Sequence, residues 1–521
     1  MIPENKNRLL FKILLALLGL IGAIAIALLT SRYGAGVTSD SVYYISVARH
    51  IADGTGFIGY DGFNFVLQPP LYPLLLAAAK IIFSLDPLVS AGYLNAILLG
   101  LIVYLSGLFL FKYLKSAALT IIGTAYILIS FVFIQNFLIA LSEPLFILFV
   151  LLYLYYFDDY RTKGTITPLI LFSAAASLAC FTRYVGVIII LAGAVSIFIW
   201  KRKSLKVMFM HLIIFLLITI SPTGLWIFRN YFLSGTLVGQ RADSSYTLAE
   251  NLRFLFNTVL KWYLPLQINA LQLLFLMLIV AAEIFTGIVL IKKWKIEDIR
   301  LNHIGPALIF ILFYSGIIVI SSTTTAYDKI ADRLLSPIFI PSIFLVFFLI
   351  DNILEWITKH FRQRFILIMF LIAIIVWMEY PAAKSYYNIE YYVDQSGWEY
   401  SSKAWKDNLV IEYLNNHKHL ETGYSFYSNV PEAVYILTNK EAKWSPSKTL
   451  YNSPELININ PGQKNIWQEK NKTCLIWFNN IDRNFLFTLD ELQQSTKMVK
   501  VVQLKDGEIY TFRKKDKSTM K

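Results

Sequence analysis

Long apolar runs recur along this chain and constrain its fold more than any other feature. Runs of about 20 apolar residues are each long enough to cross the roughly 30 Å hydrocarbon core of a bilayer. The first, 9–29, follows Lys6, Arg8 and Lys12; it is too long for a signal-peptide core and lacks a small-x-small cleavage site. We interpret it as a retained signal anchor. With 56% hydrophobic residues among 521, the sequence predicts an α-helical polytopic membrane protein.

Positive charge is concentrated between the apolar runs. The net charge is +13, and Lys and Arg cluster at 112–115, 161–163, 201–206, 292–300 and 359–364. Short basic loops stay on the cytoplasmic side of a membrane, so this charge indicates topology and not nucleic-acid binding. Keeping every cluster inside predicts about eleven spans in the cell membrane, with the N-terminus cytoplasmic. They lie near 9–30, 89–111, 117–135, 140–157, 166–182, 185–200, 207–227, 270–291, 304–322, 335–351 and 364–380.

Two polar regions are expected on the opposite side. The sequence predicts a transmembrane domain, 1–380, with a first outer loop at 31–88, and a small soluble extracytoplasmic α/β domain at 381–521. In the latter, 408–417 has a helical pattern, whereas 424–428 and 474–478 are strand-like. Segments 498–504 and 508–512 flank Lys505-Asp506-Gly507, which predicts a hairpin.

The first outer loop contains two short helix-like segments. The stretch 40–52 has one apolar stripe and ends before Gly54, so it should lie in the membrane interface. The segment 69–85 starts at Pro69-Pro70 and is short for a span, which indicates a second interfacial or re-entrant helix. Asp40 heads the first helix, where it could cap the N-terminus, act chemically, or do both.

Other charged residues sit at the predicted outer membrane edge. Glu143 follows Ser142 and precedes Pro144, which is good helix-start chemistry, yet an acid at this depth is a functional candidate. Arg183 and Arg333 could be interfacial anchors or could bind phosphate through their forked donors. Arg229 is a weaker candidate. Together they suit a lipid-linked phosphate substrate and an extracytoplasmic acceptor.

Five stretches resemble the polytopic C-type (GT-C) glycosyltransferases, in particular the family-39-like branch of protein O-mannosyltransferases and the lipid A aminoarabinose transferase. They are SDSVYYISVARHIADG, QPPLYPLLLA, SEPLFILF and the pair TRYVGV and DRLLSPIFIP. The resemblance covers roughly 9–380, and the family's first-loop acid, second acid and later basic motifs map onto Asp40, Glu143, Arg183 and Arg333.

This resemblance implies a GT-C-like fold and an enzyme that transfers a sugar from a polyprenyl-phosphate carrier. The acceptor would be a hydroxyl of an extracytoplasmic glycolipid, polysaccharide or protein, with inversion at the anomeric carbon. It implies Asp40 and Glu143 as catalytic residues and Arg183 and Arg333 as donor-phosphate ligands. Gln68, Tyr72 and Tyr184 are further candidate substrate contacts.

The chain departs from the family pattern at one point. Many relatives carry an acidic-basic pair before the Pro-Pro, whereas this chain has Leu67 and Gln68. No cofactor is therefore assigned, and a divalent cation stays an open alternative. The chain also lacks a Trp-Trp-Asp motif, which disfavours en bloc oligosaccharide transfer to asparagine.

Two other classes of function stay open on the sequence. A flippase or transporter for a lipid-linked sugar would fit the apolar runs, although such proteins tend to show paired repeats with broken helices at the membrane midplane. We see no such repeat, and the acids lie toward one face. A membrane-anchored sensor with its function in 381–521 is the second alternative.

Overall fold

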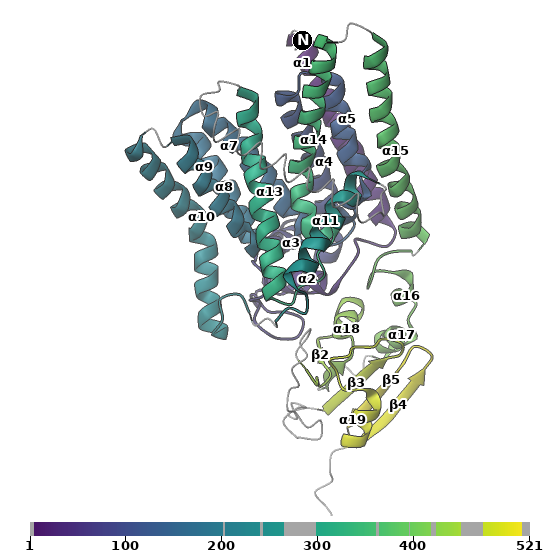
Figure 1. Cartoon of the computed structure of the whole chain (residues 1–521). Helices are drawn as coiled ribbons and strands as arrows, with labels where there is room; N and C mark the ends of the chain where they lie inside the picture. The colour runs from purple at the N-terminus through teal and green to yellow at the C-terminus, as the bar shows by residue number, and fades with distance from the viewer. Residues whose placement is uncertain are drawn as a thin grey trace, which may run out of the picture.

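The computed structural model describes residues 5–201, 204–239, 243–264, 299–360, 364–394, 396–417, 424–449 and 472–512. Most of these residues are helical, and the helices form an upright bundle with a small sheet domain beyond one end (Figure 1). The helices of the bundle are α1 (Asn5–Ser31), α4 (Pro87–Tyr113), α5 (Ala117–Ile129), α6 (Phe131–Ile134), α7 (Glu143–Lys163), α8 (Ile166–Thr182), α9 (Val187–Lys201), α10 (Leu205–Ser234), α13 (Ile299–Thr324), α14 (Asp332–His360) and α15 (Arg364–Asp394).

The polytopic membrane architecture is confirmed. Six described helices are long and apolar enough to cross a membrane, and a seventh span exists if α5 counts together with 131–137, which follow it after a 56° bend. The predicted spans 166–182 and 185–200 correspond to shorter apolar helices, and the predicted span 270–291 lies outside the described residues. The total of about eleven therefore stays a prediction.

Helix α15 runs across the predicted domain boundary. It continues through Pro381 to Asp394, so the predicted division at 380 falls inside a helix. Tertiary contacts hold this extension: Tyr380 donates to the Lys261 carbonyl at 2.9 Å, and Ser385 donates to the Ile129 carbonyl. Proline usually marks a helix end, but packing against neighbouring segments overrides that local preference.

The basic segments that are described gather at the bundle end where α1 begins. Phe11 of α1 stacks on Phe111 of α4 with ring centroids 4.6 Å apart. Beside them, Lys112 reaches Asp158 of α7 at 2.6 Å. Lys115 pairs with Glu355 of α14 at 2.5 Å. The start of α1 and the sheet domain lie at opposite ends of the bundle (Figure 1).

The first outer loop forms two short helices, α2 (Ser39–Ala52) and α3 (Leu71–Phe83), as predicted. Both are too short to span a bilayer. Thr38, not Asp40, is the N-cap of α2: its side chain accepts from the Ser41 amide, and the Ser41 side chain accepts from the Thr38 amide. Beyond the C-cap residue Asp53, Gly54 has φ +80°, a conformation that favours glycine. The structure thus gives the capping role to Thr38.

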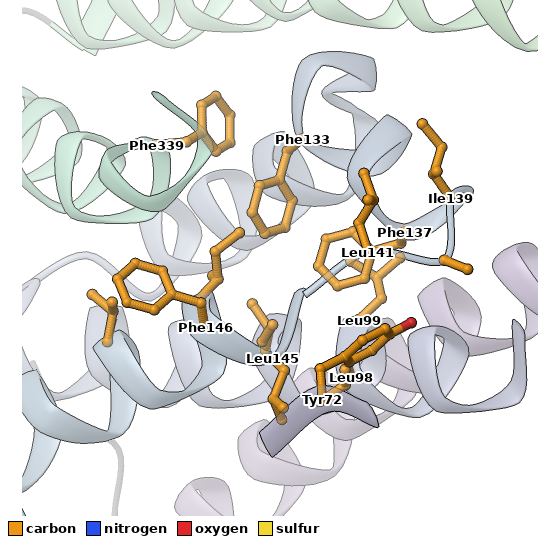
Figure 2. Close-up of a cluster of buried hydrophobic side chains, with 14 of the residues drawn as sticks. Tyr72, Leu98, Leu99, Phe133, Phe137, Ile139, Leu141, Leu145, Phe146 and Phe339 are labelled. Carbon is orange, nitrogen blue, oxygen red and sulfur yellow. The ribbon is translucent and has the colours of Figure 1, made fainter. Parts of the chain in front are cut away.

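Aromatic and aliphatic side chains pack the helices together near the bundle end that carries α2 and α3. Figure 2 shows Phe133 facing Phe339 of α14, and their rings stack at 5.3 Å. Leu145 and Phe146 of α7 are buried in the same cluster (Figure 2). Lipid is as apolar as these side chains, so close van der Waals packing is what favours the arrangement. The cluster fixes where α7 and α14 begin.

Within its described residues, the C-terminal domain contains a five-stranded sheet in the order β2-β1-β3-β5-β4. Its strands are β1 (Tyr424–Ser428), β2 (Ala442–Trp444), β3 (Lys472–Phe478), β4 (Met498–Leu504) and β5 (Gly507–Phe512). The first three are parallel and the last two form an antiparallel hairpin. Its helices are α16 (Lys403–Lys406), α17 (Leu409–Asn416), α18 (Pro431–Thr438) and α19 (Leu489–Ser495). The predicted α/β composition and hairpin are confirmed.

Candidate active site

The predicted site residues stand at helix ends. Glu143 is the first residue of α7, followed by Pro144, which suits a first helical turn because it needs no amide hydrogen. Arg183 is the C-cap of α8, with extended backbone (φ −147°, ψ 134°) at the break before α9. Arg333 lies in the first turn of α14, and Asp40 in the first turn of α2. The local sequence therefore places each of these four side chains where a helix begins or ends.

The structure brings all four together. Arg183 Nη1 lies 2.7 Å from Glu143 Oε2, and Arg333 Nε lies 3.8 Å from Glu143 Oε1. Glu143 makes no hydrogen bond of regular geometry to the described residues, so these contacts are ion pairs. With its side chain 2% exposed, Glu143 requires such compensation, because an isolated buried carboxylate is very costly.

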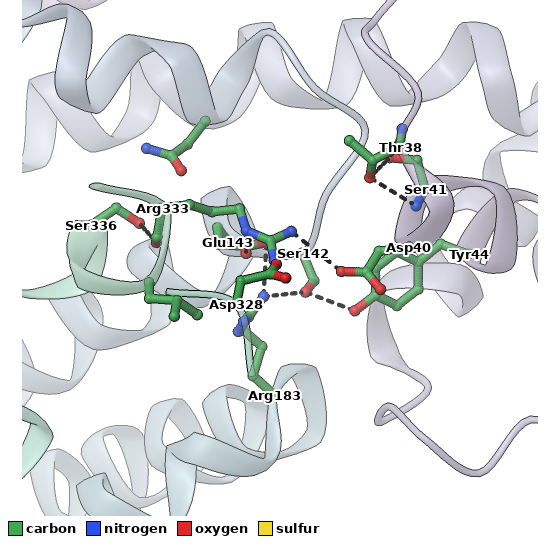
Figure 3. A network of polar contacts seen from close by, with 12 residues as sticks. Thr38, Asp40, Ser41, Tyr44, Ser142, Glu143, Arg183, Asp328, Arg333 and Ser336 are labelled. Atoms are coloured by element: carbon green, nitrogen blue, oxygen red, sulfur yellow. Dashed lines mark hydrogen bonds and ion pairs between the residues drawn. The ribbon is translucent and has the colours of Figure 1, made fainter. Parts of the chain in front are cut away.

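Arg333 connects this buried pair to exposed acids. Its Nη1 lies 3.3 Å from Asp40 Oδ2, and its Nη2 lies 2.9 Å from Asp328 Oδ2 (Figure 3). Exposure of the side chains falls from 66% at Asp328 and 46% at Asp40 to 31% at Arg333. The network therefore runs from solvent into the protein, with Asp328 and Asp40 as its accessible carboxylates beside Arg333.

Ser142 joins the network to α2. Its Oγ accepts from Arg183 Nη1 at 3.1 Å and lies 3.1 Å from the Tyr44 hydroxyl (Figure 3). Tyr44 follows Asp40 by four residues and so lies on the same helix face. Helix α2 therefore meets the α7 and α8 ends through Tyr44 and meets α14 through Asp40.

Of the three candidate substrate contacts, one is fully buried and the other two, Gln68 and Tyr184, are half-buried. Tyr72 is fully buried, with its ring 5.1 Å from that of Tyr44. Gln68 Oε1 and the Tyr72 hydroxyl are buried without a hydrogen-bond partner among the described residues. The Tyr184 hydroxyl donates to the Val66 carbonyl at 3.0 Å and accepts from Asn230 at 3.0 Å. Tyr184 thus holds the segment around Val66 in place. Gln68 and Tyr72 each have a polar atom that could still form a hydrogen bond.

The weaker candidate Arg229 and His50 both have structural partners. Arg229 lies 4.3 Å from the Trp226 ring centroid and donates to the Phe65 carbonyl at 3.0 Å. His50 Nδ1 lies 2.6 Å from the Ile58 carbonyl oxygen, and its Nε2 lies 3.4 Å from Glu441. Within the described parts of the chain, no group of three or more His, Cys, Asp or Glu side chains is arranged to hold a metal ion.

A polar pocket of about 460 Å³ lies away from the Arg333 network, at the C-terminal end of α2. Its charged side chains form pairs, including Arg49 with Asp86 at 2.9 Å and Lys80 with Asp53 at 2.7 Å. Arg49 also donates to Asn439 of the C-terminal domain at 3.2 Å. We interpret the pocket as part of the contact between α2 and that domain.

Comparison with known proteins identifies the architecture. Residues 62–232 match the family of dolichyl-phosphate-mannose-protein mannosyltransferases. The whole chain resembles ArnT from Cupriavidus metallidurans, in the apo state and bound to undecaprenyl phosphate. Each match has a TM-score of 0.60 at 11% identity and covers 95% of this chain and 97% of that chain. The fold is therefore similar to that of ArnT. The resemblance predicted from the sequence is confirmed.

Another solved structure is less similar to this chain than ArnT is. AglB from Archaeoglobus fulgidus, an archaeal oligosaccharyltransferase in complex with an inhibitory peptide and a dolichol-phosphate, gives a TM-score of 0.45 at 14% identity. That match covers 82% of this chain and 64% of that chain. No curated protein matches the sequence.

Sequence reasoning missed Asp328 and the Tyr44 hydroxyl. Asp328 stands five residues before Arg333 and accepts a hydrogen bond from it. The nearer Asp332 instead accepts a hydrogen bond from Trp262 at 2.9 Å. A search for acids flanking Arg333 would have found both aspartates without telling which one it binds. The four-residue spacing between Asp40 and Tyr44 indicates that the two side chains share a helix face, which could have identified Tyr44.

Proposed function

We propose that this protein is an integral-membrane glycosyltransferase that moves a sugar from a polyprenyl-phosphate carrier to a hydroxyl of an extracytoplasmic acceptor, with inversion. The observation that carries the proposal is the half-exposed Asp40 carboxylate, 3.3 Å from an arginine that also contacts the buried Glu143. A base, a fixed cationic group and a C-type glycosyltransferase fold occur together. The undecaprenyl phosphate bound to ArnT supports a polyprenyl phosphate as the carrier.

Asp40 is assigned as the general base. The acceptor oxygen attacks the anomeric carbon on the face opposite the phosphate, and its proton passes to the Asp40 carboxylate. The bond from the anomeric carbon to the phosphate oxygen breaks, and its electron pair leaves with the polyprenyl phosphate. A base must lie within hydrogen-bond reach of the proton that it takes, and Asp40 is accessible from solvent at this end of the bundle.

Arg333 and Arg183 are assigned to the donor phosphate. Negative charge grows on the phosphate as the sugar leaves, and fixed guanidinium groups stabilise that charge in the transition state. Arg333 is 31% exposed and Arg183 23% exposed, so both are reachable from the site. Glu143 is assigned to holding the two arginines, since its side chain is only 2% exposed.

The same proposal covers topology. The N-terminus is assigned to the cytoplasm and the C-terminal domain to the extracytoplasmic side. Two observations support it: the basic pairs around Lys112 and Lys115 lie at the end where α1 begins, and the sheet domain lies at the other (Figure 1). The acceptor, the sugar and the length of the carrier are left unassigned.

The test is transfer by the purified protein in lipid nanodiscs. Supplied with polyprenyl-phosphate sugars and a membrane extract as acceptor source, the wild-type protein should release polyprenyl phosphate and label an acceptor. If the donor is moved between leaflets of a sealed vesicle without being consumed, the rival assignment as a flippase is correct. The C-type glycosyltransferase fold does not favour that rival.

A further inference from the structure

Two different faces of helix α2 contact two different parts of the protein. Asp40 and Tyr44 face the ion-pair network of α7, α8 and α14. Ser39 and His50 lie eleven residues apart, almost exactly three helical turns, and so share a different face. Both contact the C-terminal domain, Ser39 through Glu432 and His50 through Glu441. The helix that carries the proposed base is thus held between the two domains.

The Ser39–Glu432 contact is the one next to Asp40. Ser39 Oγ donates to Glu432 Oε1 at 3.0 Å. Glu432 stands in the first turn of α18 and is 1% exposed, and burial raises the pKa of its carboxyl group. Arg483 Nη2 lies 4.0 Å from the same oxygen, while Oε2 has no hydrogen-bond partner in the part of the chain that the structure describes. An acid this deeply buried is costly unless its neighbours compensate it.

The backbone before α2 is clamped on both sides. Gly36 donates to the Leu138 carbonyl at 2.7 Å, in the segment that leads to Glu143. Val37 donates to the Trp398 carbonyl at 3.4 Å, and Tyr400 donates back to the Val37 carbonyl at 3.1 Å. The segment entering α2 therefore forms short bridges to the membrane domain and to the start of the C-terminal domain.

We propose that Glu432 is a positioning residue for the transfer reaction: through Ser39 it fixes the first turn of α2 and so the place of the Asp40 carboxylate. This inference rests on the proposed function. The pair between Asp40 and Arg333 is half-exposed, and such pairs hold geometry weakly. The Ser39 hydrogen bond is part-buried: Ser39 itself is exposed, but the bond ends on a carboxylate that is only 1% exposed, and hydrogen bonds to carboxylates are directional. The C-terminal domain thus contributes to catalysis without touching the substrate.

Three variants and two controls test the proposal in the full-length protein in nanodiscs. Ser39→Ala and Glu432→Ala remove either side of the contact, whereas Glu432→Gln keeps an acceptor oxygen of the same shape. Glu441→Gln is the matched control, because Glu441 docks the other end of α2. Glu491→Gln controls for loss of an acid elsewhere in the C-terminal domain, since the contacts of Glu491 with Lys448 and with Thr488, the N-cap of α19, stay within that domain.

The first readout is hydrogen exchange at the first turn of α2, where the Val42 amide donates to the Thr38 carbonyl at 3.0 Å. Ser39→Ala and Glu432→Ala should each speed this exchange about tenfold, as expected for loss of one hydrogen bond to a carboxylate. Glu432→Gln should stay near wild type, and so should both controls. Unchanged exchange in the two alanine variants overturns the inference.

The second readout is steady-state transfer. The alanine variants should lower kcat about 10- to 100-fold with a nearly unchanged KM for the donor, because a displaced base affects the chemical step. The double variant should be no slower than either single one. Additive losses, or an equal loss in Glu441→Gln, would show a general effect of domain docking and overturn the assignment to Glu432. If the wild-type protein transfers no sugar, the proposed function fails, and the exchange readout still decides whether Glu432 holds α2.

Discussion

Arg333 Nη1 lies 3.3 Å from Asp40 Oδ2, although the two residues are 293 positions apart in the chain. This contact joins the first turn of α14 to the first turn of α2. It places an accessible carboxylate and a guanidinium side by side at the bundle end near the C-terminal domain. The predictions below separate what this pair and its neighbours do for stability from what they do for transfer.

Asp40→Asn should lower transfer at least about 100-fold, because the amide cannot accept the acceptor's proton. The protein should stay folded, since Thr38 and not Asp40 caps α2. The measurement is release of polyprenyl phosphate by equal amounts of the two purified proteins. Asp328→Asn is the matched control: it removes the other exposed acid on Arg333 and should cost less than about tenfold. Transfer at the wild-type rate by Asp40→Asn would sink the assignment of the base.

Arg183→Met should destabilise the protein by about 3–5 kcal/mol, because it leaves the buried Glu143 carboxylate without its 2.7 Å partner. Adding Glu143→Gln should recover much of that stability, since the uncompensated charge is gone. Thermal unfolding in one detergent would measure both variants. We expect the double variant to remain inactive, because the cation for the donor phosphate is still missing. Recovery of transfer together with stability would contradict the phosphate role of Arg183.

Undecaprenyl phosphate should raise the unfolding temperature of the wild-type protein, because a ligand that binds only the folded state stabilises it. Arg333→Gln should lose most of that shift. Arg8→Gln, at the opposite end of the bundle, should keep it. An undiminished shift in Arg333→Gln would remove Arg333 from the donor site, and undecaprenol without phosphate tests whether the head group matters.

The contact between His50 and Glu441 predicts a pH dependence of domain docking. The hydrogen bond to Glu441 raises the pKa of His50 from its ordinary 6.5, and its counterpart to His50 lowers the pKa of Glu441 from 4.5. A raised histidine pKa stabilises the folded state below pH 6.5 and loses that effect as pH rises through the folded pKa. A lowered glutamate pKa stabilises the folded state above pH 4.5, and that stabilisation is lost as pH falls through the folded pKa.

The pair should therefore contribute most between about pH 4.5 and 6.5. Asp53 adds to the effect by further raising the pKa of His50. The contribution is small, since the Glu441 side chain is 62% exposed to screening water. Comparing the thermal stability of wild type and His50→Gln across this range is the measurement. Parallel curves for the two proteins would show that this pair does not couple docking to pH.

The sequence by itself determined the features that depend on local pattern. Apolar runs of membrane-spanning length predict the helical bundle, because transfer into lipid depends on the residues of each run. The stripe at 40–52 and the stop at Gly54 predicted α2, and Lys505-Asp506-Gly507 predicted the β4–β5 hairpin. The four charged candidates were found in the same way, as polar residues where an apolar run ends.

Only the tertiary structure decided how these residues are used. Thr38 caps α2, the Tyr184 hydroxyl bonds to the Val66 carbonyl, and α15 continues through Pro381. Ser39 donates a hydrogen bond to Glu432, 393 residues away in the chain. Arg333 donates to Asp328, whereas the nearer Asp332 accepts from Trp262. Local patterns report which face of a helix is apolar. They do not report which distant helix end packs against it, and the energies of buried ion pairs and hydrogen bonds depend on that packing.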